Sequence, residues 1–90
     1  SVYGAAKAGM EGLIRTLAKE FGPGGITANS IVLGLINTVP PEFSKGAERY
    51  FATGRIGTPQ DIGAAAVYLA SEEASWVTGH SLVVNGGYLR

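Results

Sequence analysis

The chain contains no cysteine and only one histidine, and these absences remove several kinds of site. Without cysteine it can form neither a disulfide framework nor a thiolate metal site. A single imidazole, that of His80, cannot build a zinc site by itself. We therefore expect that the protein holds no metal ion.

An excess of charge of either sign is also missing. Lysine and arginine together number 7, aspartate and glutamate together number 7, and the formal net charge is zero. No basic stripe is present, so we expect no nucleic-acid partner and no anionic membrane partner. No apolar run approaches the roughly 18–20 residues needed to cross a bilayer, and no signal-peptide pattern opens the chain. These observations favour a soluble, cytoplasmic protein.

The chain begins without methionine, and Ser1 lies only two positions before Tyr3, the first candidate for chemistry. A small independent domain rarely places its chemistry in a first turn that frays. We interpret residues 1–90 as the C-terminal part of a longer polypeptide.

Apolar residues recur with the spacings of helices and strands. Met10, Leu13 and Leu17 follow three- and four-residue steps, which indicate one face of a helix. The stretch 22–25, made of glycine and proline, ends this helix. The stretch 26–33 is rich in β-branched and apolar residues between glycines, which is typical of a buried parallel strand.

Thr58, Pro59 and Asp61 predict the start of a second helix. They offer a capping hydroxyl, a proline for the first helical position and an acid for the positive end of the helix. The predicted elements are a helix over 2–21, a strand over 26–33, a loop over 34–41, a short helix from 41 or 42 towards 51, a helix from 59 to 70 and a strand over 81–84. This order predicts the second half of a doubly wound, parallel α/β sheet.

Tyr3 and Lys7 are four residues apart at the start of the first predicted helix, so their side chains share one face. An unperturbed phenol titrates near pH ~10 and is a poor proton donor at neutral pH. A positive charge about 4–6 Å away lowers the pKa of a phenol, and a general acid works best when its pKa lies near the operating pH. Such a pair is most often only a solvated helix face. It can also exchange a proton with a substrate oxygen, with Lys7 lowering the pKa of Tyr3.

Several segments resemble signatures of the short-chain dehydrogenase/reductase family, in the family's order and spacing over nearly the whole chain. They are Tyr3-Gly4-Ala5-Ala6-Lys7, the stretches 17–22 and 25–29, Gly34-Leu35-Ile36-Asn37-Thr38, and the stretches 55–62 and 76–87. The resemblance, which is strongest to the 3-oxoacyl reductase branch, implies a Rossmann-type fold. Residues 1–90 would then be the C-terminal part of a single NAD(P)-binding domain whose N-terminal cofactor half is absent.

The resemblance also implies roles for individual residues. Tyr3 is the general acid/base, and Lys7 lowers its pKa and binds the nicotinamide ribose. Gly34, Ile36 and Thr38 match the cofactor-binding segment, in which Ile36 backbone groups and the Thr38 hydroxyl hold the nicotinamide carboxamide. A plain turn after a strand is the alternative for these three residues. The cofactor is NAD or NADP, with NADP favoured by the resemblance.

The implied reaction transfers a hydride between NAD(P)(H) and a carbonyl or alcohol substrate. The spacing from Tyr3 to Lys7 is not the wider one of the enoyl-reductase branch, so carbon–carbon double bonds are disfavoured as substrates. The resemblance further implies homodimers or homotetramers. Gly9 and Gly12 agree with this, because each helical glycine costs about 1 kcal/mol relative to alanine and suggests a close backbone approach.

The chain departs from the family in two respects. Leu33 stands before Gly34 where the family usually has proline, which would fix φ at about −65° and remove a donor. The family's catalytic serine lies well before the tyrosine, so Ser1 does not match it, and the catalytic asparagine and the glycine-rich phosphate turn are not in the chain. We therefore expect the 90 residues to be inactive alone. The alternative is a non-catalytic oligomerisation or scaffold fragment that retains the family signature.

The loop from residue 39 to residue 54 would shape the substrate site. Phe43, Tyr50 and Phe51 suggest an apolar lid over the substrate. We treat this lid as a hypothesis, because the loop carries no decisive polar anchor.

Two strands cannot make a stable sheet of this kind, because a buried parallel strand needs neighbours on both edges and helices over both faces. We predict that residues 1–90 are poorly folded when expressed alone. Thermal unfolding followed by circular dichroism tests this, and a cooperative transition of a monomer would contradict it.

Overall fold

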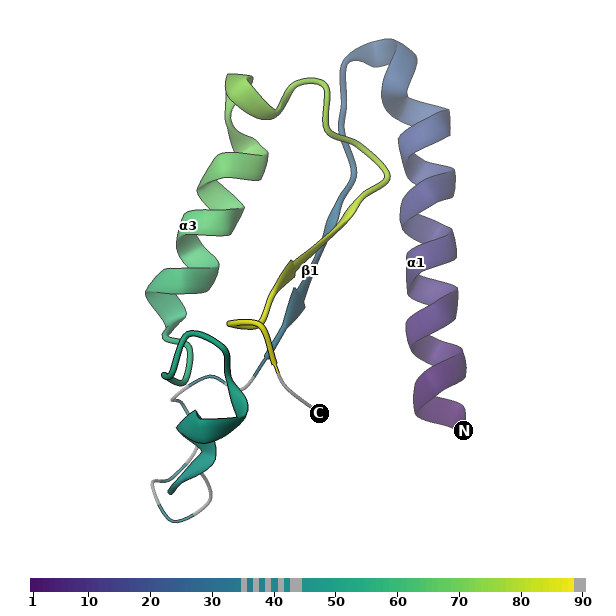
Figure 1. Ribbon diagram of the computed structural model, residues 1–90. Coiled ribbons are helices and arrows are strands. Elements are labelled where there is room, and N and C mark those ends of the chain that lie inside the picture. Colours follow the sequence, from purple (N-terminus) through teal and green to yellow (C-terminus); the bar gives the residue numbers. More distant parts are fainter. Residues whose placement is uncertain (35, 37, 39, 41, 43–44, 89–90) are drawn as a thin grey trace. The chain divides into compact units, whose positions relative to one another are not determined.

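The computed structural model describes residues 1–34, 36, 38, 40, 42 and 45–88. Its elements are the helix α1 (Val2–Phe21), the 3-10 helix η1 (Gly22–Gly24), the strand β1 (Ser30–Leu33), the 3-10 helix η2 (Ala47–Tyr50), the helix α3 (Pro59–Ala70), the 3-10 helix η3 (Glu72–Ala74) and the strand β2 (Ser81–Val84) (Figure 1). The chain forms two compact units. The first unit comprises Ser1–Ser30 and Tyr68–Leu82, and the second comprises Ile31–Val67 and Val83–Arg90.

The helix α1 has the bounds that the apolar spacing predicts. Its first turn is capped by Ser1, whose Oγ accepts a hydrogen bond from the Gly4 N–H at 3.1 Å. A capping hydroxyl satisfies one of the N–H groups that a helix leaves unpaired at its start. The helix gives way to η1, and Gly25 then turns the chain with a φ of 84°. The predicted stop over residues 22–25 is therefore confirmed.

The two strands form a two-stranded sheet. The Ser30 N–H donates to the His80 carbonyl at 2.9 Å, and the Gly34 N–H donates to the Val84 carbonyl at 3.2 Å. From the first bond to the second, the donor moves four residues forward along the chain and so does the acceptor. The pairing is therefore parallel (Figure 1). The parallel sheet expected from the order of helices and strands is confirmed.

The predicted start of the first strand at residue 26 is wrong, because β1 begins only at Ser30. The two residues before it make several hydrogen bonds that involve side chains, beside one backbone bond from the Gly79 N–H to the Ala28 carbonyl at 2.7 Å. The Ala28 N–H donates to Thr78 Oγ1 at 3.0 Å. Asn29 donates through its side-chain amide to the Val77 carbonyl, and its side-chain oxygen accepts from the backbone N–H of the residue that precedes β2. Side-chain hydrogen bonds of this kind compete with regular secondary structure.

The predicted helix from residue 41 or 42 towards residue 51 is also wrong in extent. Glu42 is the one described residue of the stretch 41–44, and it has helical geometry. A turn follows at residues 45–46, and the helix η2 covers Ala47–Tyr50 alone. Gly46 precedes η2 with a φ of 76°, a left-handed conformation that a continuous right-handed helix does not allow. The starting position Pro41 lies outside the described residues.

The second unit is built around the buried Phe51, which is 5% exposed. The centroids of the Phe51 and Tyr88 rings lie 5.3 Å apart. The next two residues, Ala52 and Thr53, donate backbone hydrogen bonds at 3.1 Å to the carbonyls of residues 87 and 86. The segment after η2 is therefore joined to the chain that follows β2.

Most large apolar side chains in the described part of the chain are exposed, for example Val67 at 71% and Trp76 at 95%. A Cβ atom added at Gly9 or Gly12 would meet no atom within 4 Å. No described residue therefore makes the close backbone approach that these two glycines suggest, and a partner there stays a prediction. None of the described helices is both long enough and apolar enough to cross a membrane.

Two glycines of the second unit form a matched pair for testing close packing. A Cβ at Gly34 would lie 3.0 Å from the Cα and Cβ of Asn85, whereas a Cβ at Gly63 in α3 would meet nothing within 4 Å. We predict that Gly34→Ala destabilises the full-length protein by about 1–3 kcal/mol through overpacking. Gly63→Ala should instead stabilise it by up to about 1 kcal/mol through helix propensity. Urea unfolding measures both changes, and a neutral Gly34→Ala would contradict the close approach.

Candidate functional site

Tyr3 and Lys7 lie side by side on the first turns of α1. The Lys7 Nζ is 5.7 Å from the centroid of the Tyr3 ring, within the range of about 6 Å in which a cation is attracted to an aromatic face. The structure thus brings this pair together, as the four-residue spacing predicts. The catalytic role of both residues stays a prediction.

Both side chains of this pair are open to solvent, and Tyr3 is 73% exposed. Water screens a charge strongly at such a position, so the ammonium group acts weakly on the phenol there. Lys7 forms no ion pair with a carboxylate anywhere in the described part of the chain. Its ammonium group therefore keeps donors for a ligand hydroxyl.

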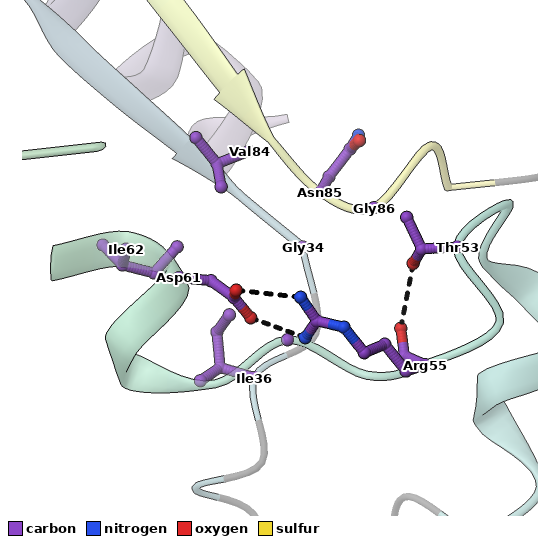
Figure 2. A pocket seen from close by; sticks show the side chains of 10 residues that line it. Gly34, Ile36, Thr53, Arg55, Asp61, Ile62, Val84, Asn85 and Gly86 are labelled. Atoms are coloured by element: carbon purple, nitrogen blue, oxygen red, sulfur yellow. Dashed lines mark hydrogen bonds and ion pairs between the residues drawn. The ribbon is translucent and has the colours of Figure 1, made fainter. Parts of the chain in front are cut away.

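The predicted cofactor-binding residues are divided between the units: Gly34, Ile36 and Thr38 lie in the second, whereas Tyr3 and Lys7, predicted for both catalysis and cofactor binding, lie in the first. Ile36 pairs with Gly57 in a parallel β-bridge, and Thr38 is an exposed turn residue. Gly34 and Ile36 line one cavity of about 150 Å³ (Figure 2). The structure thus brings two of the five predicted cofactor residues to the same cavity.

An ion pair lies on another wall of this cavity. Arg55 donates through Nη1 to Asp61 Oδ2 at 2.7 Å and through Nη2 to Asp61 Oδ1 at 2.9 Å, so the pair is bidentate (Figure 2). Charge-assisted bonds in this fork geometry are short and directional. The pair is only partly shielded, because the side chains of Arg55 and Asp61 are 57% and 30% exposed.

Asp61 also organises the start of α3. Its Oδ2 accepts hydrogen bonds from the Thr58 backbone N–H at 2.8 Å and from Thr58 Oγ1 at 3.1 Å. In return the Asp61 N–H donates to Thr58 Oγ1 at 3.3 Å. This reciprocal arrangement is a capping box with aspartate in place of glutamate. The predicted helix start at Thr58 and Pro59 is confirmed.

The surroundings of Asp61 keep its side chain ionised. The hydrogen bonds from the Arg55 guanidinium, and then that from the Thr58 backbone, hold the pKa of Asp61 well below its usual range. The hydrogen bonds that Arg55 donates to Asp61, and then the negative charge of that carboxylate, raise the pKa of Arg55. The capping pattern predicts Asp61 at the helix start but does not reveal its partner Arg55. The sequence offers one clue, an arginine three residues before a capping threonine whose acid follows three residues later.

A second cavity of the same unit, about 510 Å³, is lined by Leu33, Tyr50 and Phe51 among others. Phe51 lines it as a buried residue whose ring packs on that of Tyr88, and the apolar lid stays a hypothesis. Tyr50 accepts a hydrogen bond through its hydroxyl from Arg49 Nη2 at 2.8 Å. The third member of the suggested lid, residue 43, lies outside the described residues. In the described part of the chain, no group of three or more acidic or histidine side chains could hold a metal ion.

Residues 1–89 match the family model described as Enoyl-(Acyl carrier protein) reductase. The chain is 44% identical over 92 residues to 3beta-hydroxysteroid dehydrogenase 1 of Eggerthella lenta, covering 94% of this chain and 35% of that protein. It is 41% identical over 90 residues to the 3-oxoacyl-(acyl-carrier-protein) reductase FabG of Salmonella typhimurium, covering 94% of this chain and 37% of that protein. The chain belongs to the short-chain dehydrogenase/reductase family.

Solved structures agree on the fold. The chain superposes with a TM-score of 0.85 and 35% identity on a blue fluorescent protein from a metagenomic library in complex with NADPH, covering 98% of this chain and 37% of that one. It superposes with a TM-score of 0.79 and 34% identity on 4-hydroxyisoleucine dehydrogenase complexed with NADH, covering 94% of this chain and 37% of that one. The α/β fold is therefore of the Rossmann type. The chain spans 35% to 37% of the length of these four relatives.

The ionised state of Asp61 predicts a pH dependence of stability. Its pKa is lower in the folded than in the unfolded protein, so its stabilising effect is complete above the ordinary carboxyl pKa of about 4 and is lost as the pH falls below that value. We expect Asp61→Asn to be less stable than the wild-type full-length protein at pH 7, and the difference to shrink below about pH 4. Urea unfolding at several pH values measures this.

Glu48→Gln is the control for this experiment, because Glu48 is an exposed acid of η2 that forms no ion pair with the described residues. Its stability should follow that of the wild type across the same pH range. A difference between wild type and Asp61→Asn that stays constant down to about pH 3 would contradict the role given to the Asp61 charge.

Proposed function

We propose that this chain supplies the C-terminal part of an NAD(P)-dependent oxidoreductase that interconverts a carbonyl and an alcohol. The observation that carries the proposal is the pair on α1, with the Lys7 ammonium 5.7 Å from the ring of Tyr3. The pair stands in a Tyr-Gly-Ala-Ala-Lys segment of a chain that belongs to the short-chain dehydrogenase/reductase family.

Each unit by itself carries groups that suit part of a nicotinamide dinucleotide, which would supply or accept the hydride when bound. Two of the solved relatives are named as complexes with NADH and with NADPH, which supports binding of either form. In our proposal the Ile36 backbone and the Thr38 hydroxyl hold the carboxamide, since an amide needs both a donor and an acceptor. Lys7, which has no carboxylate partner among the described residues, donates to the ribose hydroxyls.

In this proposal Tyr3 transfers the proton. Its hydroxyl gives a proton to the substrate oxygen during reduction and takes it back during oxidation. In the proposal the positive charge of Lys7 stabilises negative charge that develops on the Tyr3 oxygen during proton transfer, and this effect grows when water is removed from around the pair. Because both residues are exposed in this chain, we propose that the pair acts only when ligands and the rest of the protein cover it.

For the substrate we propose a carbonyl or alcohol rather than an enoyl group. The matching family model carries an enoyl-reductase description, but individual relatives are named otherwise. They include the hydroxysteroid dehydrogenase, the 3-oxoacyl reductase and a (3R)-3-hydroxyacyl-CoA dehydrogenase of the dog, which is 39% identical over 90 residues. A cytoplasmic location and a homodimer or homotetramer complete the proposal. The location comes from the absence of an apolar spanning run and of a signal-peptide pattern in the sequence, and the oligomer comes from the family resemblance.

The alternative function is a non-catalytic oligomerisation or scaffold segment that keeps the family signature. It differs from the proposed enzyme in one simple way, because a scaffold needs no glycine-rich strand–turn–helix and no serine upstream in the gene. The sequence that precedes Ser1 in the gene therefore separates the two.

Tyr3→Phe in the full-length protein tests the proposed function directly. Removing the hydroxyl removes the proton donor, so we expect the turnover number for reduction of a carbonyl substrate to fall by about 10²–10⁴-fold. The affinity for NAD(P)H, measured by quenching of nucleotide fluorescence, should stay nearly unchanged.

Tyr68→Phe is the matched control, because it removes a tyrosine hydroxyl from α3, where the sequence predicts no catalytic role. It should keep the turnover number of the wild type. An unchanged turnover number in Tyr3→Phe would exclude Tyr3 as the general acid/base.

A further inference from the structure

The stretch of chain that carries Gly34 and Ile36 is held by backbone contacts on two sides. On one side, the Gly34 N–H donates to the Val84 carbonyl at 3.2 Å, and Gly34 packs so closely on Asn85 that a Cβ would lie 3.0 Å from it. On the other side, Ile36 pairs with Gly57 in the parallel bridge. The place of the Ile36 backbone therefore depends on the place of Gly57.

Gly57 itself has no side chain that could anchor it, and its position is set by its neighbours. Arg55 precedes it by two residues and Thr58 follows it directly, and both are bonded to the carboxylate of Asp61. Arg55 Nη1 also donates to the Ile56 carbonyl at 3.3 Å. Asp61 lies in the first turn of α3, so its carboxylate joins both sides of Gly57 to that helix.

Thr53 makes further hydrogen bonds that hold the segment containing Arg55. Thr53 donates through Oγ1 to the Arg55 carbonyl at 3.5 Å, and its backbone N–H donates to the Gly86 carbonyl at 3.1 Å (Figure 2). All these groups belong to the second unit and line the 150 Å³ cavity with Gly34 and Ile36. The ion pair is thus the one charged element in the described lining of this cavity.

We propose that Asp61 and Arg55 are positioning residues that set the nicotinamide end of the cofactor site by fixing Gly57 and, through the bridge, the backbone of Ile36. This inference depends on the proposed function, because it assumes that Ile36 binds the carboxamide. It adds two residues that touch neither cofactor nor substrate.

The Arg55–Asp61 ion pair should affect the position of the binding groups more than the free energy of unfolding. Partly exposed ion pairs contribute little to the free energy of unfolding, about 0–1 kcal/mol. A bidentate arginine–carboxylate pair nevertheless fixes distance and angle, because two parallel bonds leave little freedom to rotate. A small displacement of a binding group can be costly, since about 1 Å of misplacement can lower a rate up to about 10²-fold.

The test uses the full-length protein and two probes, the reduced dinucleotide NAD(P)H and the matching ADP-ribose, which lacks the nicotinamide ring. Asp61→Asn keeps the size of the side chain and an oxygen that can accept from the Thr58 N–H, but it loses the charge and one oxygen of the fork. We expect its dissociation constant for NAD(P)H to rise on the order of tenfold. Its dissociation constant for ADP-ribose should stay within about twofold of the wild type.

Two arginine variants of the same unit complete the design. Arg55→Lys keeps the charge and offers a single donor group, so it should recover part of the affinity that Arg55→Gln loses. Arg49→Gln is the matched control, because Arg49 bonds only to the Gly46 carbonyl and the Tyr50 hydroxyl in the described part of the chain. It should leave both dissociation constants unchanged.

Each result decides the inference. An Asp61→Asn variant that binds NAD(P)H as tightly as the wild type, or that loses both probes equally, overturns it and leaves the proposed function untouched. A wild-type protein that binds neither probe overturns the proposed function and this inference together. If Asp61→Asn does not fold, the comparison of Arg55→Lys with Arg55→Gln takes its place, because equal loss of both probes there again overturns the positioning role.

Discussion

The structure depends on the parallel pairing of β1 with β2. Ser30 and Ser81, at the start of this pairing, belong to the first unit, and their hydroxyls are 2.9 Å apart in a hydrogen bond. Gly34 and Val84, at its end, belong to the second unit. Parallel neighbours require a long crossover connection, and that connection contains η2 and α3. The pairing of these two short strands thus contributes backbone bonds to each unit.

The candidate chemistry is divided between these units. Tyr3 and Lys7 form one group on α1, and Ile36 stands in the other unit, next to Gly57 and the Arg55–Asp61 pair. In our proposal the first group moves a proton, and the second holds an amide by its backbone. A family of hydride-transfer enzymes needs both functions, because a hydride and a proton must reach the same carbonyl.

Local signals in the sequence were sufficient to predict the ends of helices that are set by residues within one or two turns. The bounds of α1 and the start of α3 follow from apolar spacing and capping residues, since both act within one or two turns. Local signals failed where distant residues compete for the backbone. Thr78 takes the Ala28 N–H from a position fifty residues away, which shortens β1. The start of η2 has a different and local cause, because the left-handed backbone of Gly46 directly precedes it.

The sequence by itself determined that Tyr3 and Lys7 share a helix face, because a spacing of four residues has that consequence in any α-helix. It also determined the family, through segments that keep their order along the chain. Only the tertiary structure decided that Arg55 reaches Asp61 and that Ile36 pairs with Gly57. The reason is physical, because such contacts depend on how loops return in space, and the chemical nature of each residue does not specify its partner.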